Sequence, residues 1–557
     1  MGRNGESFEA LIEGYAERRV SRRQFFARAA ALGISASAAA NVLAAAGPVA
    51  AALAAPTVKR GGTLIEGYDR DFAKMDTVLT TWDDPTMVAL YEFTVIRDAK
   101  GKFVPDLFAS WTVSKNLLTW TFKLRPGLTF HSGAPVTAEA VAANFNAFRN
   151  PKIGQNAIFW PSVKGVKAQG PTTVIVTMSK PFTAFPETLA TEAAMIQNLA
   201  TRKAKPKAYG VSVVDGTGPF TLTSYQPGIK VEVKRWDKYP GSGVPYVKNK
   251  KAAYLDGVRW VPILEVGQRA NELESGSVMA VKNPAPQDVD RLKGNPDIVV
   301  VEFPSLAGYW ISPNHQATNL GFDDVRVRQA MSHAIDRPGL VKALFFGHAA
   351  ADYGPIAPNW KWYDKRVEQY NQYDPDKAKS LLDAAGWKVG SDGVRAKNGN
   401  KLSWTHIGDA GQPDTAGIDV AIAAMLKKVG MDMQVKALPA AQWGSTVTGK
   451  TPPASWGFEW LWSSPMDLLV FFYAYPSDKY NGSLPAVKAA VKAWQSAPSD
   501  AKLKAAAQAM QVAWAQLLPK VPIVTRNDVY AFNKKVMGYQ PLQSMLYPLY
   551  NDVWINA

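Results

Sequence analysis

One stretch of the chain matches the pattern of a nucleotide-binding loop. Residues 444–451 read GSTVTGKT, which fits G-x-x-x-x-G-K-[ST]. In a working loop of this kind a helix begins at the lysine, and the amide groups of its first turn hold the phosphates. Pro452 and Pro453 follow at once, and a proline disfavours the helical conformation in the residue before it. We therefore interpret the match as accidental and expect no nucleotide hydrolysis.

Other residue types used in catalysis do not form recognisable patterns. The sequence contains neither G-x-S-x-G nor H-E-x-x-H, and none of its five histidines pairs with another at metal-ligand spacing. His333 lies between apolar positions of an expected helix, and His131 stands at an expected turn, so we interpret both as structural. The sequence thus predicts no catalytic residue, metal or cofactor. A carboxylate pair that forms only in the folded chain cannot be recognised from one sequence.

The most distinctive candidate for binding is the aromatic stretch, residues 456–472, which reads WGFEWLWSSPMDLLVFF. Three tryptophans fall within seven residues, and only Glu459 and Asp467 carry charge. Gly457 and Pro465 argue against one continuous helix, so we expect a short strand, a loop and then a helix from about Asp467. Taken alone, such a strand can line either a core or a pocket.

The N-terminal 54 residues are typical of an export signal. A polar lead precedes SRRQFF at 21–26, and an alanine-rich run follows it. Arg22 and Arg23 before two phenylalanines resemble a twin-arginine signal. The run is too rich in alanine to predict a permanent membrane span. We expect cleavage after Ala54, with an uncleaved anchor or a disordered tail as the alternative.

The composition excludes several classes of protein. The chain of 557 residues contains no cysteine, which excludes disulfides, cysteine-ligated metals and a thiol nucleophile. The net charge is +16, but the basic residues are dispersed, and their densest cluster is only Lys248, Lys250 and Lys251. We therefore do not expect nucleic-acid binding, but solvated basic faces with some preference for acidic ligands or an anionic membrane surface.

Strands and helices are mixed along the whole chain, which predicts an α/β fold. Residues 118–125 (LTWTFKLR) alternate between apolar and polar positions, as expected of a strand with one buried face. Thr137 is the expected cap of the helix that follows. Residues 403–407, 415–429 and 431–437 read as strand, helix and strand, which predicts parallel pairing in the second half of the chain.

Four segments, in the right order, resemble the periplasmic solute-binding proteins of ABC importers, in the peptide- and nickel-binding class known as family 5. They are LTWTFKLRPGLTFHSGAPVTAEAV (118–141), GTGPFTLTSYQPG (216–228), FDDVRVRQAMSHAIDR (322–337) and YDPDKAKSLLDAAGW (373–387). The resemblance covers nearly all of the chain after the signal. It implies a two-lobed α/β fold of the periplasmic-binding-protein type, in an enlarged form with an extra subdomain in the first lobe, mixed sheets and a hinge of crossing strands.

The same resemblance implies the division of the chain. An export signal would occupy 1–54, and the first lobe 55–309, with its extra subdomain near 100–205. The second lobe would occupy 310–524, and 525–557 would return to the first lobe. The lobes would close on a small solute or short peptide and pass it to an ABC transporter permease in the inner membrane. We accordingly expect a periplasmic monomer that is not an enzyme.

The resemblance also implies a ligand site between the lobes, which favours a pocket for the aromatic stretch. The expected contacts come from one loop of the first lobe, from the hinge and from the aromatic stretch: Thr81, Trp82 and Asp83; Tyr309 and Trp310; and Phe458, Glu459, Trp460, Trp462 and Asp467. The main chain of such strands can hold an extended ligand by strand addition.

One position departs from the family pattern. Peptide binders of the family usually carry an aspartate four residues before the proline of the aromatic stretch, where it pairs with the ammonium group of the peptide. Leu461 stands there, and Glu459 is a possible substitute. Loss of a charge-assisted contact of about 1.5–3 kcal/mol would weaken binding about 10- to 100-fold. An opine-like conjugate, a glycoside or a metal chelate is therefore an alternative to a peptide, and a secreted hydrolase on a similar frame is the alternative of a different class.

Overall fold

The computed structural model describes most of the chain after the N-terminal segment. The described residues are 24, 28–29, 58–79, 84–153, 155–160, 162–306, 308–410, 415–447, 449–459, 485–542 and 547–556. The chain separates into two compact units, one made of Met1–Lys59 with Asn556–Ala557 and the other of Arg60–Ile555. Arg22, Arg23 and the expected cleavage site lie outside the described residues. In the ranges above, no helix is both long and apolar enough to cross a membrane.

The larger unit is built on a long mixed sheet. Along its main path the order is β19 (Asp432–Leu438), β18 (Ser403–Asp409), β20 (Ser455–Glu459), β13 (Tyr309–Pro313), β21 (Val521–Asn533), β11 (Ala280–Lys282), β1 (Thr63–Tyr68), β10 (Gly257–Pro262), β9 (Lys230–Arg235) and β8 (Phe220–Gln226). Two further strands, β12 (Ile298–Pro304) and β14 (Ala349–Ala351), pair with β21.

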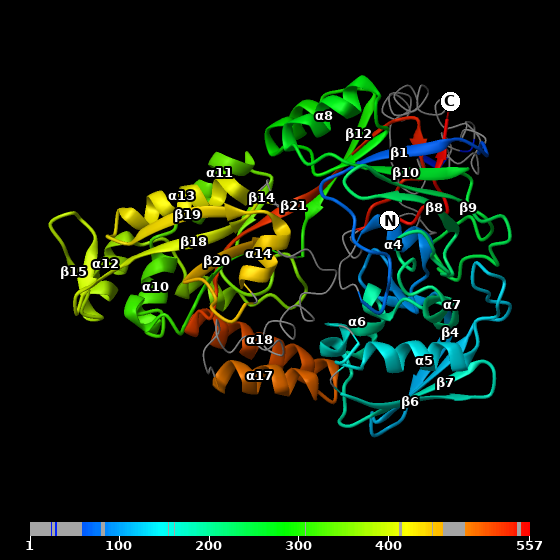
Figure 1. The fold of residues 1–557 in the computed structure, drawn as a ribbon, viewed down its shortest axis with the longest axis horizontal. Helices are drawn as coiled ribbons and strands as arrows, with labels where there is room; N and C mark the ends of the chain where they lie inside the picture. Colours follow the sequence, from blue (N-terminus) through cyan, green and yellow to red (C-terminus); the bar gives the residue numbers. More distant parts are fainter. Residues whose placement is uncertain are drawn as a thin grey trace. The chain divides into compact units, whose positions relative to one another are not determined.

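Strand β21 lies in the middle of this sheet and pairs with strands on both sides of it (Figure 1). Its first residues pair with β13 and β14, as in Tyr309↔Val524, while its last residues pair with β11 and β12, as in Ala280↔Phe532. We call β1 and β8–β12 the first-lobe strands, and β13, β14 and β18–β20 the second-lobe strands. Because β12 and β13 are consecutive, the chain also passes between the two groups there. The predicted α/β class with mixed sheets is confirmed, whereas the exact lobe boundaries stay a prediction.

Helices cover both faces of the second-lobe strands. One face packs against a core that includes α10 (Val325–His333), α11 (Arg337–Phe345), α12 (Pro375–Ala384) and α13 (Ala416–Lys427). The other face packs in a cluster that includes α14 (Ala440–Val447) and α18 (Asp500–Leu517). Strands β18, β19 and β20 run parallel, as the strand–helix–strand pattern predicts.

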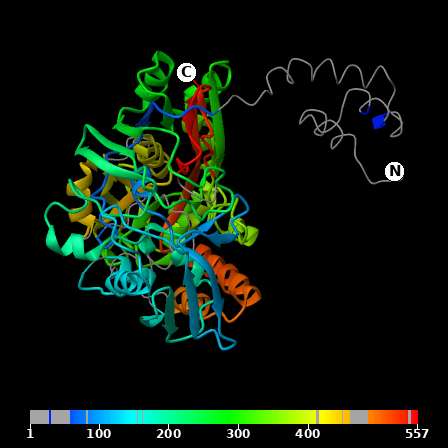
Figure 2. The same ribbon diagram turned by 90° about the vertical axis from the view of Figure 1, so that its right-hand side faces the viewer.

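A separate small sheet contains β4 (Phe108–Val113), β5 (Thr119–Leu124), β7 (Thr173–Met178) and β6 (Val163–Gln169), with α5 (Ala138–Phe148) against it. Its strand β5 buries the predicted face of Trp120, Phe122 and Leu124, and the Thr137 side chain caps α5 at Ala140 N. This region lies beside α17 (Pro485–Gln495) and α18 in both views (Figures 1 and 2), where Thr183 Oγ1 donates to the Ala497 carbonyl at 2.9 Å.

The structure agrees with the rejection of the nucleotide-binding loop. Helix α14 ends at Val447, three residues before Lys450, and β20 begins at Ser455. The lysine therefore stands after a helix rather than at the start of one, so no helical N-terminus is available there to hold a phosphate. The two histidines expected to be structural both contact the main chain: the buried His333 has its Nδ1 2.6 Å from the Gln372 carbonyl, and the partly buried His131 has its Nε2 3.1 Å from that of Gly218.

Candidate functional site

Charged and polar residues gather where parallel strands of both lobes end. Strand β1 runs parallel to β10 and β11, and Asp69 and Arg70 follow it directly, while Asn283 follows β11. In the second lobe, β20 ends at Glu459 beside the parallel strand β18, which ends at Asp409. The carboxyl ends of parallel strands are the usual place for ligand sites in α/β proteins. The side chains at these strand ends therefore form the candidate site.

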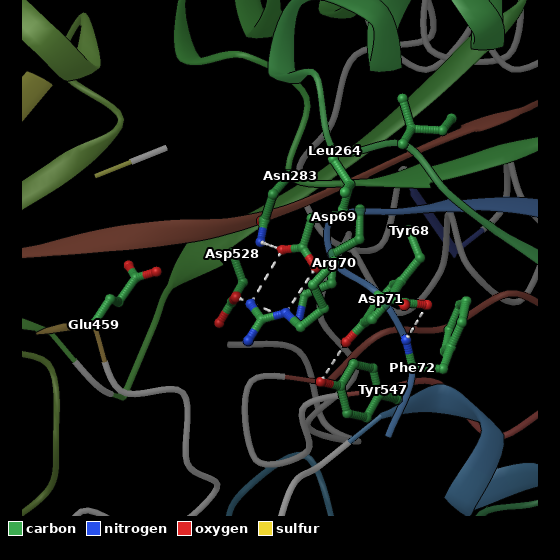
Figure 3. A network of polar contacts seen from close by, with 12 residues as sticks. Tyr68, Asp69, Arg70, Asp71, Phe72, Leu264, Asn283, Glu459, Asp528 and Tyr547 are labelled. Carbon is green, nitrogen blue, oxygen red and sulfur yellow. Dashed lines mark hydrogen bonds and ion pairs between the residues drawn. The ribbon is translucent and has the colours of Figure 1, made fainter. Parts of the chain in front are cut away.

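At the end of β1 a buried carboxylate holds an arginine (Figure 3). Arg70 Nε donates to Asp69 Oδ1 at 3.1 Å, and its Nη2 lies 3.4 Å from Oδ2. Asn283 Nδ2 donates to Asp69 Oδ2 at 2.7 Å. The Asp69 side chain is only 1% exposed, whereas that of Arg70 is 22% exposed. The carboxylate of Asp69 is therefore buried, while the guanidinium of Arg70 is partly exposed to solvent.

Arg526 of β21 connects this group to the second lobe. Its Nε donates to Glu459 Oε1 at 2.5 Å, and its Nη2 lies 4.0 Å from Asp69 Oδ2. The side chains of Glu459 and Arg526 are 4% and 10% exposed. Glu459, the predicted substitute for the missing aspartate, thus forms a buried ion pair in this structure, and a ligand ammonium group would have to compete with Arg526 for it.

Three more charged side chains complete the cluster. Lys282 is fully buried, with its Nζ 3.8 Å from Asp528 Oδ1 and 4.5 Å from the centre of the Tyr547 ring. Arg269 donates to the carbonyls of Asn283 and Asp69 at 2.7 and 3.2 Å. We call the seven charged residues the junction cluster: Asp69, Arg70, Arg269, Lys282, Glu459, Arg526 and Asp528.

The junction cluster holds its charges in ionised form at the end of β1. Burial alone would raise the pKa of the Asp69 carboxyl, but Arg70, Lys282 and Arg269 outweigh it and hold that pKa well below its usual value. Burial would lower the pKa of Arg70, but Asp69 outweighs it and raises that pKa well above its usual value. Arg70 therefore carries a full positive charge at any physiological pH.

Tyr309, a predicted site residue, is fixed inside the second lobe. Its hydroxyl makes a short hydrogen bond to Asp419 Oδ1 on α13, and the residue is 2% exposed. To reach Asp419 the phenol passes directly over Gly457, because a Cβ at position 457 would stand 1.7 Å from the Tyr309 hydroxyl oxygen. The glycine in the aromatic stretch is thus required by this close approach.

Trp310 and Phe458 point to the opposite face of the sheet, as strand alternation requires. The Trp310 ring packs on Trp514 with centroids 5.5 Å apart, and Phe458 stacks on Trp443 at 4.7 Å. Both residues are at most 3% exposed. The described part of the aromatic stretch, residues 456–459, is therefore in the core, and ligand contacts by these two rings stay a prediction.

The remaining predicted contacts lie outside the described residues: Thr81, Trp82, Asp83, Trp460, Trp462 and Asp467, together with Leu461. Val78, just before the loop, is buried in a large hydrophobic cluster that also contains Trp456 and Phe458. Asp84, just after the loop, caps the helix α4 (Pro85–Leu90); burial raises its pKa to about 6, although hydrogen bonds from Thr86 and Met87 oppose the shift.

One chain of contacts has the residue types of a hydrolase triad. His406 Nδ1 lies 2.8 Å from Ser455 Oγ, and His406 Nε2 lies 3.2 Å from Asp419 Oδ1. Ser455 and His406 are 0% exposed, and the serine oxygen also accepts a hydrogen bond from Trp404 Nε1 at 2.7 Å. A nucleophile must reach a substrate carbonyl, and this serine lies inside a sheet, so we assign these residues a structural role. Within the described ranges no cluster of acidic and histidine side chains could hold a metal ion.

Most of the junction cluster was not anticipated from the sequence. Only Glu459 was among the predicted contacts, and the other six residues of the cluster were not: Asp69, Arg70, Arg269, Lys282, Arg526 and Asp528. One sequence signal was present: the run YDRD at 68–71 places three charged residues next to one another, at the end of β1. The partners of these residues come from distant segments, such as Asn283, which is 214 positions from Asp69.

Comparisons with known proteins agree with the fold and with the four sequence segments. The model of the bacterial extracellular solute-binding proteins, family 5, matches residues 102–483. The chain is 28% identical over 463 residues to the glutathione-binding protein GsiB of Escherichia coli K12, a match that covers 79% of this chain and 84% of that protein.

Two solved structures show the same fold. The periplasmic binding protein DppA of Helicobacter pylori, in complex with the peptide STSA, has a TM-score of 0.76 at 23% identity and covers 90% of this chain and 99% of its own. The binding protein AgaA of A. tumefaciens R10, in complex with agropinic acid, also has a TM-score of 0.76 at 23% identity and covers 89% and 99%. The chain belongs to family 5 of the bacterial extracellular solute-binding proteins.

Proposed function

We propose that the protein is an extracytoplasmic receptor that captures a peptide or peptide-sized solute and delivers it to an ABC transporter permease. The observation that carries this proposal is the junction cluster, in which charged side chains from strand ends of both lobes meet around β21. A solute bound there would contact both lobes at once. Binding would then favour the closed arrangement of the lobes, because only that arrangement offers all of its contacts.

The family and the sequence support an assignment of residue ranges to the two lobes and of residues to the ligand site. The lobes comprise 55–309 with 525–557, and 310–524, and the solute lies between the loop 80–84 and the end of β20. Thr81, Trp82 and Asp83 contribute from the loop, and Trp460, Trp462 and Asp467 contribute beyond Glu459. The twin-arginine signal with Arg22 and Arg23 directs the protein to the periplasm, where it acts as a monomer and performs no catalysis.

A non-peptide solute is the second candidate, and one observation favours it. The carboxylate of Glu459 already accepts a hydrogen bond from Arg526, and Leu461 carries no charge, so neither residue offers an uncommitted acid to a peptide ammonium group. A solute without a free ammonium group, such as an opine-like conjugate, a glycoside or a metal chelate, avoids this cost. AgaA, with the same fold, is described in complex with agropinic acid.

The proposal is tested by thermal unfolding of the exported protein with a panel of solutes: glutathione, the peptide Ser-Thr-Ser-Ala and agropinic acid. A cognate solute at 100 times its Kd stabilises the folded protein by about 2.7 kcal/mol. The solute is then recovered and analysed by mass spectrometry. Stabilisation with intact solute supports the receptor. Conversion of the solute would favour the hydrolase, and no stabilisation by any member, with no solute co-purifying, would contradict the receptor.

A further inference from the structure

Arg70 differs from the other charged residues of the junction cluster in its exposure. Its side chain is 22% exposed, compared with 10% for Arg526, 4% for Glu459 and 0% for Lys282. A solute can therefore reach Arg70 without displacing an existing ion pair. To reach Lys282 or Glu459, a solute would have to break the contact of that residue with Asp528 or Arg526.

The buried Asp69 carboxylate holds the guanidinium of Arg70 in one orientation. Asp69 accepts from Nε and Nη2, and Asp69 is itself fixed by Asn283 Nδ2 and lies under the Arg269 guanidinium, which donates to its carbonyl. No described residue accepts a hydrogen bond from Nη1 of Arg70. A guanidinium carries five N–H donors in a planar fork that matches the two oxygens of a carboxylate. The free edge of Arg70 is thus oriented before any solute arrives.

The charge balance of the junction cluster also favours an anion. Four cations, Arg70, Arg269, Lys282 and Arg526, stand against three anions, Asp69, Glu459 and Asp528, which leaves one positive charge in excess. The cations are close enough to act on one another: burial is the main cause that lowers the pKa of Lys282, Asp528 and Asp69 oppose it, and Arg70 and Arg526 lower it further. An added carboxylate would relieve this repulsion.

We propose that Arg70 binds a carboxylate group of the solute and that Asp69 positions its guanidinium. This inference rests on the proposed receptor function and narrows its substrate class to solutes with at least one free carboxylate. Peptides with a free C-terminus and opine-like acids remain in that class, and neutral glycosides leave it.

The test is a comparison of acids with their neutral derivatives by calorimetric titration. The probes are Ser-Thr-Ser-Ala with its C-terminal amide, and glutathione with its diethyl ester, so that neither derivative has a free carboxylate. The proteins are the wild type, Arg70→Gln, Arg70→Lys, Asp69→Asn and, as a control, Arg259→Gln, since Arg259 is a half-exposed arginine of the same lobe that pairs with Glu232. Thermal unfolding of each variant checks that it is folded.

For the probe that the wild type binds, we expect Arg70→Gln to weaken the acid about 10- to 100-fold and to leave the neutral derivative unchanged. Arg70→Lys should restore part of the loss. Asp69→Asn should weaken only the acid, which a general structural defect would not do. If Arg70→Gln still distinguishes acid from neutral derivative as the wild type does, the role of Arg70 is wrong although the receptor function stands. If the wild type instead binds only a neutral co-purified solute, the receptor function stands and the role of Arg70 is wrong. If it binds neither probe pair and no solute co-purifies, both proposals fail.

Discussion

The ends of β1 and β20 meet in one cluster but hold their charges in different ways. At the end of β1 the acid Asp69 is buried and its cation Arg70 is partly exposed. At the end of β20 both the acid Glu459 and its partner Arg526 are buried, and that partner comes from β21, which both lobes share. The first pair is local, between neighbouring residues, whereas the second joins strands 67 positions apart.

This difference suggests separate roles for the two ion pairs, one in the stability of the fold and one in recognition of the solute. A buried ion pair between distant strands strongly destabilises the fold when only one partner is removed, because a charge is left without compensation. Loss of the partly exposed Arg70 costs less, since water solvates its charge and the buried Asp69 keeps Asn283 as a donor and Lys282 and Arg269 as nearby cations. We infer that the end of β20 mainly holds the lobes' strands together and that the end of β1 mainly meets the solute.

The largest expected effect comes from breaking the buried pair. Arg526→Met should reduce the free energy of unfolding by about 3–5 kcal/mol, because Glu459 stays buried without its cation. The double variant Arg526→Met with Glu459→Leu should lose less, since both charges are gone. Urea unfolding measures both, with Arg259→Met as the control for an exposed pair. A double variant as unstable as the single one would show that the pair is not what stabilises the junction.

A smaller effect is expected inside β20 itself. Gly457→Ala should reduce the free energy of unfolding by about 1–3 kcal/mol, because the new Cβ would overlap the Tyr309 hydroxyl and force the strand or the ring to move. The control is Gly267→Ala in α8 (Val266–Ser275), where a Cβ meets nothing within 4 Å. Urea unfolding of the two variants should give opposite changes, since alanine favours a helix. An unchanged midpoint for Gly457→Ala would mean that Tyr309 does not hold the end of β20 rigid.

The smallest effect concerns the pH dependence at the end of β1. The pKa of Asp69 is lower in the folded chain than its unfolded value of about 4, so its contribution to stability is present above that pH and is lost as the pH falls further. The stability difference between wild type and Asp69→Asn should therefore shrink when unfolding is measured from about pH 5 down to about pH 3. Other acids titrate in both proteins and cancel. A difference that stays constant over this range would contradict the assigned state of Asp69.

The sequence predicted those parts of the fold that depend on neighbouring residues. Strand β5 follows from the alternation of Trp120, Phe122 and Leu124, and the cap of α5 follows from Thr137. The absence of a helix after the apparent nucleotide-binding motif follows from Pro452 and Pro453. Each of these features needs only a few adjacent positions, so local propensity decides it.

The site could be predicted only in part because its contacts are distant. Alternation places neighbours within one strand on opposite faces, but it does not say that Trp310 and Phe458 share a face or that this face packs on Trp514 and Trp443. Gly457 was interpreted as a helix breaker, whereas its physical reason is the Tyr309 ring from another strand. Glu459 was a candidate for an ammonium group because its partner, Arg526, cannot be identified without the fold.

The most direct test of the account is native mass spectrometry of the protein purified from the periplasm, as wild type and as Arg70→Gln. The account predicts that the wild type carries one intact solute with a free carboxylate, and that the variant is folded but has lost it. A wild type that carries no solute would contradict the account, as would a neutral solute retained equally by both proteins.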